Sequence, residues 1–131
     1  MIVIDASAVV ELLLQGPRAD RLAARIRAGG SALHAPELVV LEVVQVFRKA
    51  RAAGRLTKAR AQLAFDALLE LRMQRYTHAP LLERVWSLRD NLSAYDATYV
   101  ALAESLDVPL LTLDAGMAKA ARHRAKVEVL R

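Results

Sequence analysis

Four carboxylates occupy positions in this chain where acidic side chains are costly. Asp5 and Asp114 each follow a short apolar run, Met-Ile-Val-Ile and Pro-Leu-Leu-Thr-Leu. Glu42 interrupts a run of Leu and Val residues, and Asp96 begins an apolar stripe at helical spacing. Carboxylates on core-facing elements repel one another and are expensive to desolvate. A divalent metal would offset both costs, so these residues indicate a metal-dependent enzyme.

The ligand chemistry of such a site limits the choice of metal. Oxygen ligands without His or Cys favour Mg²⁺ or Mn²⁺. These ions keep several of their waters and bind substrate phosphates. One ion can activate a water while a second stabilises the leaving oxygen of a phosphodiester.

Short apolar runs alternate with helical patterns along the chain. We expect strands over residues 2–4, 31–34, 74–78, 109–113 and 127–130 and helices over 7–14, 18–28, 37–53, 57–72, 81–89, 94–106 and 115–123. Strands separated by helices favour βα crossovers and a parallel sheet. The first and fourth strands can be neighbours at the topological switch point, which would place Asp5 beside Asp114. The helix pair over 37–72 is expected to form a clip or a dimerisation surface.

Composition predicts one α/β domain over residues 1–131. The chain is 55% hydrophobic, which is enough to form a core. It has no Cys, which excludes disulfides, thiolate metal sites and cysteine nucleophiles and fits a cytoplasmic location. No apolar run reaches the roughly 20 residues that span a bilayer, and we expect neither a signal peptide nor a membrane partner.

The net charge of +5 admits two explanations. A basic body around an acidic pocket suits a polyanionic substrate, whereas ordinary solvated helix faces explain the charge equally well. Only 5% of the residues are aromatic, which argues against a base-stacking platform. The basic residues recur in three parts of the chain: Arg18, Arg21, Arg25 and Arg27; Arg48, Lys49, Arg51, Arg55, Lys58 and Arg60; and Lys119, Arg122, Arg124 and Lys126.

Each acid also has a purely structural explanation. Asp5 and Asp114 precede predicted helices and can cap them, and the segment from Ser93 to Asp96 fits a capping box. Capping does not exclude metal binding. Glu42 lies in the middle of a predicted helix, where the alternative is a partly exposed helix edge.

Other side chains are assigned by their surroundings. We expect Phe47 and Trp86 in the core, and Phe65 in the core or in an interface of the helix pair. Four acids are expected on solvated faces: Glu83, Asp90, Glu104 and Asp107. The histidines share no ligand spacing and are expected at the surface or at strand edges: His34, His78 and His123.

The motifs around the four acids resemble the signature of PIN-domain nucleases. They are Asp5-Ala6-Ser7, Glu42, the stretch 95–103 with Tyr-Asp-Ala at its start, and Leu-Thr-Leu-Asp over 111–114. The length and the helix pair are similar to the toxin half of bacterial VapBC toxin–antitoxin pairs. The resemblance implies a PIN-like α/β fold: a short central parallel sheet of four to five strands, flanked by helices, with a protruding helix pair.

The same resemblance implies a Mg²⁺- or Mn²⁺-dependent endoribonuclease. Asp5, Glu42, Asp96 and Asp114 would be the catalytic, metal-binding carboxylates, and Ser7 and Thr112 would be supporting polar groups. Gln45 is a departure, because similar toxins often carry Asn at this position.

The expected partners follow from the same family. They are an RNA substrate, a second copy of the chain in a homodimer, and a cognate antitoxin with a DNA-binding domain and an inhibitory tail. An apolar groove on the helix pair would accept an amphipathic segment of such a partner.

Two other functions compete with the nuclease hypothesis. A haloacid-dehalogenase-like phosphatase needs a second Asp where this chain has Ser7, and a receiver domain needs an acidic pair and a late Lys that we do not find. A non-catalytic PIN-like module that binds RNA or protein stays open. Degenerate PIN domains usually lose acids from the pocket, and all four are present here.

Overall fold

A five-stranded parallel sheet forms the centre of the computed structural model, which describes residues 1–120 and 123–131. The strand order is β3-β2-β1-β4-β5, so β1 and β4 are neighbours, as predicted. The strands are β1 (Ile2–Ile4), β2 (Leu33–Pro36), β3 (Gln74–Tyr76), β4 (Leu110–Thr112) and β5 (Val127–Val129). The chain runs outward from β1 in both directions, which makes the β1–β4 boundary the topological switch point.

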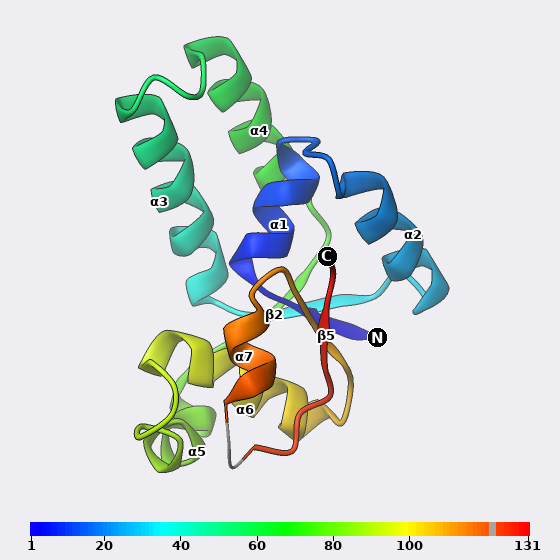
Figure 1. Ribbon diagram of the computed structural model, residues 1–131, viewed down its shortest axis with the longest axis vertical. Helices are drawn as coiled ribbons and strands as arrows, with labels where there is room; N and C mark the ends of the chain where they lie inside the picture. Colours follow the sequence, from blue (N-terminus) through cyan, green and yellow to red (C-terminus); the bar gives the residue numbers. More distant parts are fainter. Residues whose placement is uncertain (121–122) are drawn as a thin grey trace.

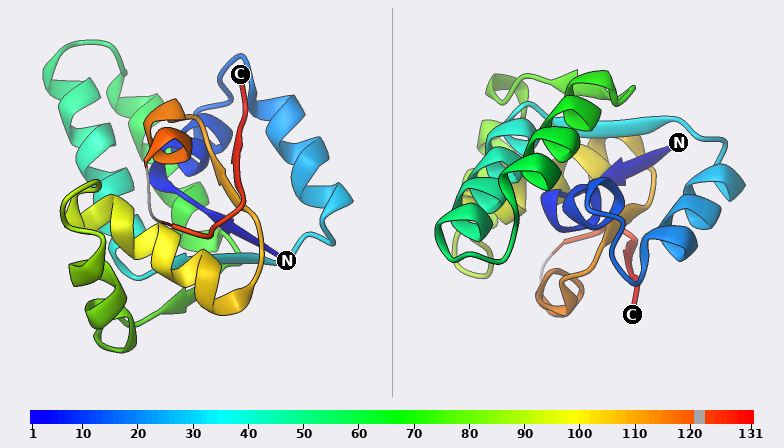
Figure 2. Two further views of the ribbon diagram at one scale, coloured as in Figure 1. Left: turned by 60° about the horizontal axis from the view of Figure 1, so that its bottom comes forward. Right: turned by 90° about the horizontal axis from the view of Figure 1, so that it is seen from above.

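Helices cover both faces of this sheet (Figure 1 and Figure 2). They are α1 (Ala6–Leu13), α2 (Ala19–Ala28), α3 (Leu38–Ala52), α4 (Lys58–Glu70), the 3-10 turn η1 (Ala79–Leu81), α5 (Leu82–Ser87), α6 (Ala94–Leu106) and α7 (Ala115–Lys119). On one face α1 packs against α2, α3 and α4, and on the other α6 contacts β1, β2, β4 and α5. The predicted α/β fold is confirmed.

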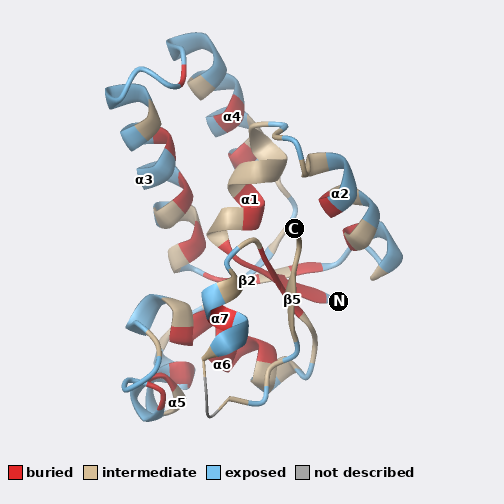
Figure 3. Cartoon of the chain, in the orientation of Figure 1, coloured by how far each residue is buried: buried red, intermediate tan, exposed pale blue. Residues whose placement is uncertain are grey.

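The core lies between the strands and the helices that cover them (Figure 3). Val3, Ile4 and Leu110 have no exposed surface, and α6 is buried at every residue from 97 to 103. Burial of one such aliphatic side chain contributes about 1.5–3 kcal/mol. The first turns of the helices that follow β1 and β2 are therefore held rigidly at the sheet edge.

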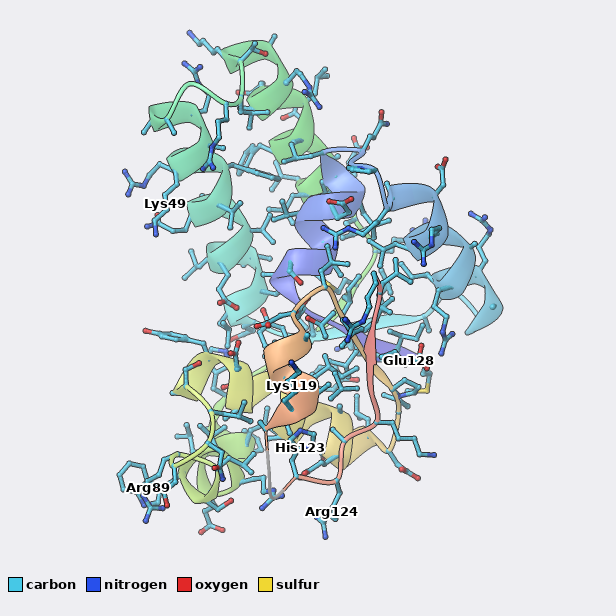
Figure 4. The ribbon with its side chains drawn as sticks, in the orientation of Figure 1. Lys49, Arg89, Lys119, His123, Arg124 and Glu128 are labelled. Carbon is cyan, nitrogen blue, oxygen red and sulfur yellow. The ribbon has the colours of Figure 1, made fainter. Side chains whose placement is uncertain are left out.

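Helices α3 and α4 project from the body as an arm (Figure 1). Phe47 is buried between them, as predicted, whereas Phe65 is 37% exposed. Leu41 and Leu63 are also exposed. Figure 4 shows Lys49 on the outer side of α3, pointing away from α4. The arm thus combines exposed apolar and basic side chains, which agrees with the predicted protruding helix pair.

Two predicted element boundaries were wrong. Strand β2 lies two residues later than expected and includes Pro36. Pro36 has no N–H to donate, but it lies at the end of β2 and pairs only with β3. The hydrogen bond to β3 at this point comes from the next residue, whose N–H (Glu37) donates to Tyr76 O at 2.8 Å. Helix α7 ends at Lys119, before the predicted end at His123. Ala120 and His123 are not helical, and residues 121–122 of that predicted helix, with Arg122, lie outside the described residues.

Two predictions about single side chains were also wrong. Trp86 is 68% exposed, and the guanidinium of Arg89 lies 4.5 Å from its ring centre. On the short helix α5 the neighbouring Val85 faces the core, so Trp86 faces away from it. Glu104, expected on a solvated face, has a side chain only 5% exposed.

Ion pairs fasten the C-terminal segment to the helices. Glu104 on α6 receives two hydrogen bonds from the Arg84 guanidinium, at 2.7 and 2.9 Å, and one from the backbone N–H of Arg124 at 2.7 Å. Arg25 on α2 pairs with Glu128 on β5 through two contacts of 2.6 and 2.7 Å. Figure 4 labels Arg124 and Glu128 on this segment. In the described part of the chain, no helix is both long and apolar enough to cross a membrane.

Candidate active site

The four suspected acids lie on elements that meet at the carboxyl edge of the sheet. Asp5 follows β1, and Asp114 comes two residues after β4. Helix α3 starts directly after β2 and carries Glu42 in its second turn. Helix α6 leads back into β4, so its first turn, with Asp96, lies at the same edge. This edge, at the switch point, is where parallel α/β sheets build their sites.

Asp5 is buried and fully engaged by hydrogen bonds. Its Oδ1 accepts from the Ser7 hydroxyl at 2.7 Å and from the Ala8 backbone N–H at 3.1 Å, which makes Asp5 the N-cap of α1. Its Oδ2 accepts a short hydrogen bond from the Thr112 hydroxyl on β4. Asp5 therefore links β1, α1 and β4, and its carboxylate has a fixed orientation.

The same two hydroxyls also hold the end of β4. Ser7 Oγ accepts from the Leu113 N–H at 3.0 Å, and Thr112 Oγ1 accepts from the Asp114 N–H at 2.9 Å. The Asp114 carboxylate caps α7 by accepting from the Gly116 N–H at 2.8 Å. The two expected supporting residues thus connect Asp5 to the backbone at Asp114.

Glu42 is held from the opposite layer. Its Oε1 accepts a 2.6 Å hydrogen bond from the phenol of Tyr99, a residue only 1% exposed. Tyr99 lies on α6, one turn after Asp96, whose N–H donates to the N-cap hydroxyl of Ser93 at 3.1 Å. Sequence reasoning placed Tyr99 on the apolar stripe of α6 and missed its hydroxyl. The helical spacing of Asp96 and Tyr99 was the available signal.

The acids interact electrostatically as one group. Burial raises the pKa of Asp5, and the charge of Asp114 adds to the rise while hydrogen bonds from Thr112 and Ser7 oppose it. Burial also raises the pKa of Glu42, to which the charges of Asp96 and Asp5 contribute. The pKa of Asp96 is raised by burial and by the charges of Asp114 and Asp5. The structure therefore brings all four predicted acids into one network.

The chemistry of this network fits a hard divalent cation. The four acids offer only oxygen donors, which Mg²⁺ and Mn²⁺ prefer. A cation would offset both the burial and the weaker mutual repulsion that raise three of the carboxyl pKa values. Within residues 1–120 and 123–131, however, no three His, Asp or Glu side chains are arranged to hold a metal as they stand. Two of the four carboxylates are instead engaged by the hydroxyls of Ser7, Thr112 and Tyr99.

These raised pKa values predict a pH- and metal-dependent stability. The folded protein retains protons on these acids that the unfolded chain has already released, so metal-free stability should fall as pH rises from ordinary carboxyl pKa values to the raised ones. Above that window, Mg²⁺ or Mn²⁺ at about 100 times its dissociation constant should add about 2.7 kcal/mol. Melting temperatures with EDTA or metal across this pH range measure both effects. The exposed-acid variant Glu83→Gln should keep the metal shift, and a parent melting temperature indifferent to millimolar metal would contradict a shared site.

The three histidines make their hydrogen bonds away from the four acids, at partly exposed positions. His34 Nδ1 hydrogen-bonds to the Tyr76 hydroxyl at 2.7 Å, and His78 Nε2 accepts from the Leu38 N–H at the start of α3. His123 Nε2 lies 3.0 Å from the Met117 carbonyl oxygen. Each is at least partly buried, and each connects two segments of the fold.

Gln45 has no contact that would bring it into the acid network. Its side chain is exposed, and its Oε1 accepts from the Arg48 guanidinium one turn further along α3. The side chain of Gln45 thus extends along the exposed surface of α3.

Comparison with known proteins gives a consistent result. The sequence profile of the PIN domain family matches residues 2–123. Ribonuclease VapC1 of Mycobacterium tuberculosis is 41% identical over 130 residues, which cover 98% of this chain and 97% of VapC1. Among solved structures, VapBC2 from Rickettsia felis bound to a promoter DNA fragment superimposes with a TM-score of 0.73 at 15% identity, covering 98% of each chain. A toxin–antitoxin complex from Klebsiella pneumoniae gives a TM-score of 0.64 at 17% identity, covering 98% of this chain and 97% of the other.

Proposed function

Because this chain belongs to the PIN domain family and is VapC-like along its whole length, we propose that it is a Mg²⁺- or Mn²⁺-dependent endoribonuclease, the toxin of a toxin–antitoxin pair. The observation that carries the proposal is the network of four carboxylates at the carboxyl edge of the sheet. The choice of RNA as substrate is supported by the related proteins named ribonucleases. The choice of metal is supported by the oxygen-only donors of the four acids.

Asp5, Glu42, Asp96 and Asp114 are the residues that would hold the cation. A bound Mg²⁺ or Mn²⁺ lowers the pKa of a water and offsets negative charge on a phosphodiester. The chain's own contribution is orientation. Hydroxyl donors fix Asp5, and the rigid N-terminus of α6 presents Asp96 on the same side. Donors that hold a carboxylate in one orientation reduce the reorganisation that the site needs during the reaction.

Binding of RNA must be supplied by residues outside the acidic network, because carboxylates repel phosphates. The chain carries a net charge of +5, and the α3–α4 arm displays exposed Arg48, Lys49, Arg51, Arg55 and Lys58. Contacts between such residues and phosphates release counterions, so RNA affinity should fall steeply with salt. We therefore place the activity of this protein in the cytoplasm, where it would meet an RNA substrate.

The antitoxin is proposed to bind along the arm. A groove between α3 and α4 has an apolar lining that includes Val44, Phe47 and Phe65, and a basic rim that includes Arg51 and Lys58. Such a surface fits an amphipathic segment with acidic flanks. The toxin–antitoxin structures that share this fold support a partner of this kind. A homodimer is proposed from the family alone.

The direct test is cleavage of total RNA by the purified, antitoxin-free chain. We expect discrete fragments with Mg²⁺ or Mn²⁺ and none with EDTA, because in the proposed mechanism the bound cation would supply the activated water. Fragment ends, read by sequencing, would identify the target RNA. Glu83→Gln, an exposed acid on α5, serves as the matched control and should cleave like the parent.

Two outcomes would change the proposal. Equal cleavage with EDTA would remove the metal from the mechanism and point to a contaminating nuclease. An antitoxin-free sample that binds RNA but leaves every RNA intact would favour the non-catalytic binding module.

A further inference from the structure

We infer that Tyr99 is a positioning residue, which holds the Glu42 carboxylate in place for the metal through its phenol hydroxyl. This inference rests on the proposed metal site and assigns a role to a residue outside the acidic set. Its basis is a 2.6 Å hydrogen bond from the Tyr99 hydroxyl to Glu42 Oε1, between residues 57 positions apart in the chain.

The bond joins two elements that bring their acids from different directions. Glu42 comes from α3, which follows β2, whereas Tyr99 comes from α6, which leads into β4. Tyr99 is 1% exposed and belongs to a stretch of α6 that is buried at every residue from 97 to 103. Because the ring is packed on all sides, its hydroxyl has a fixed position relative to Asp96, one turn earlier on the same helix. The bond therefore sets the position of Glu42 relative to Asp96.

The phenol acts as a permanent donor at this position. An ordinary phenol, with a pKa of about 10, keeps its proton at physiological pH and can donate to a carboxylate. A donor with one proton can engage only one carboxylate oxygen. The second oxygen of Glu42 stays available to a cation.

Without this bond, the Glu42 side chain would be expected to rotate away from the other acids. Glu has three rotatable side-chain bonds, and the like-charged carboxylates of Asp96 and Asp5 lie close enough to act on Glu42. Repulsion would turn the carboxylate toward solvent in the metal-free protein. The cation would then have to recover Glu42 on binding, at a cost in affinity.

The test is Tyr99→Phe, which keeps the ring and its packing and removes only the hydroxyl. Removal of a group that orients a metal ligand typically lowers metal affinity about 10–100-fold. We expect this loss for Mn²⁺ in titration calorimetry, with a matching rise in the Mn²⁺ concentration that gives half-maximal cleavage. At saturating Mn²⁺ the KM for RNA should be unchanged. The matched control is Tyr76→Phe, which removes a phenol hydroxyl bonded to His34 and should leave Mn²⁺ affinity unaltered.

A double-variant cycle keeps the inference testable whatever happens to stability. In a Glu42→Gln background the Tyr99→Phe change should cost no further Mn²⁺ affinity, because the positioned carboxylate is already gone. The inference is overturned if Tyr99→Phe binds Mn²⁺ like the parent, or if its loss persists in the Glu42→Gln background. If the parent itself fails to bind Mn²⁺ or to cleave RNA, the proposed function and this inference are both overturned. A parent that binds and cleaves, together with a Tyr99→Phe variant that binds Mn²⁺ equally well, overturns this inference alone.

Discussion

Asp96→Asn is expected to reduce RNA cleavage by more than about a hundredfold, since even residues that only orient a metal ligand are worth 10–100-fold. The carboxylate of Asp96 lies at the first turn of α6, within the electrostatic reach of Asp5 and Asp114. Replacing it with an amide keeps the shape of the side chain and removes one negative charge from the site. Cleavage rates at matched Mg²⁺ or Mn²⁺ measure the loss.

The same substitution should stabilise the protein when metal is absent. Burial raises the pKa of Asp96, and the charges of Asp114 and Asp5 add to the rise, so the ionised form is unfavourable in the folded state. Removing the charge should therefore raise the free energy of unfolding at neutral pH. The Ser93 cap survives, because it uses the backbone N–H of residue 96. Below the carboxyl pKa values the gain should vanish.

The Asp96→Asn variant is informative because cleavage should fall while metal-free stability rises. A variant that merely unfolds would lose both activity and stability. Asp90→Asn, an exposed acid before α6, is the matched control and should change neither quantity. Full cleavage by Asp96→Asn under matched metal would remove Asp96 from the mechanism. Lower metal-free stability would show that repulsion among the acids is not the dominant effect of its charge.

Local rules were sufficient to predict the parts of the site that depend on chain order. Alternation of short strands with helices predicts a parallel sheet, and a parallel sheet places the carboxyl ends of β1 and β4 at one edge. The adjacency of the segments ending in Asp5 and Asp114 follows from that geometry. N-capping by Asp5, Ser93 and Asp114 was likewise readable from residue type and position.

The remaining features depend on partners far away in sequence. The Tyr99 hydroxyl pairs with a residue 57 positions away, and periodicity classed Tyr99 as apolar. Glu104 was expected on a solvated face, yet its partner Arg84 lies 20 residues earlier in the chain. Trp86 was assigned to the core with its apolar neighbours Val85 and Leu88, although only Val85 and Leu88 are buried. Patterns along the chain predict which face of an element is buried better than which polar groups meet there.

Glu104 lies outside the site, and its replacement is expected to have a large effect on stability. Glu104→Ala should lower the free energy of unfolding by about 3 kcal/mol, because it removes one partner of a largely buried ion pair. The Glu104 side chain is 5% exposed and receives hydrogen bonds from Arg84 and from the backbone N–H of Arg124. The change would remove the acceptor that the Arg84 guanidinium and the Arg124 backbone N–H share, and it would loosen the segment that leads into β5. Denaturant unfolding at neutral pH measures the loss.

The pH dependence of this loss has a defined sign. The Arg84 guanidinium holds the pKa of Glu104 below its ordinary value. A depressed carboxyl pKa contributes stability above the unfolded value and loses it as pH falls through the folded one. The difference between parent and Glu104→Ala should therefore be largest at neutral pH and shrink in acid. This trend is opposite to that of the metal-free site, where ionisation of the carboxylates is unfavourable.

Arg124→Ala separates the buried acid from its surface neighbour. The Arg124 side chain is 83% exposed and lies 4.0 Å from the Glu104 carboxylate, whereas its backbone N–H makes the shorter contact and survives the substitution. An exposed pair of this kind contributes roughly 0–1 kcal/mol, so Arg124→Ala should unfold close to the parent. Equal losses in the two variants would assign the stability to the exposed guanidinium, and a Glu104→Ala protein as stable as the parent would show that desolvation of the acid cancels its pairing. A large loss for Glu104→Ala alone, with RNA cleavage intact below its melting temperature, would place this ion pair in the fold and outside the chemistry.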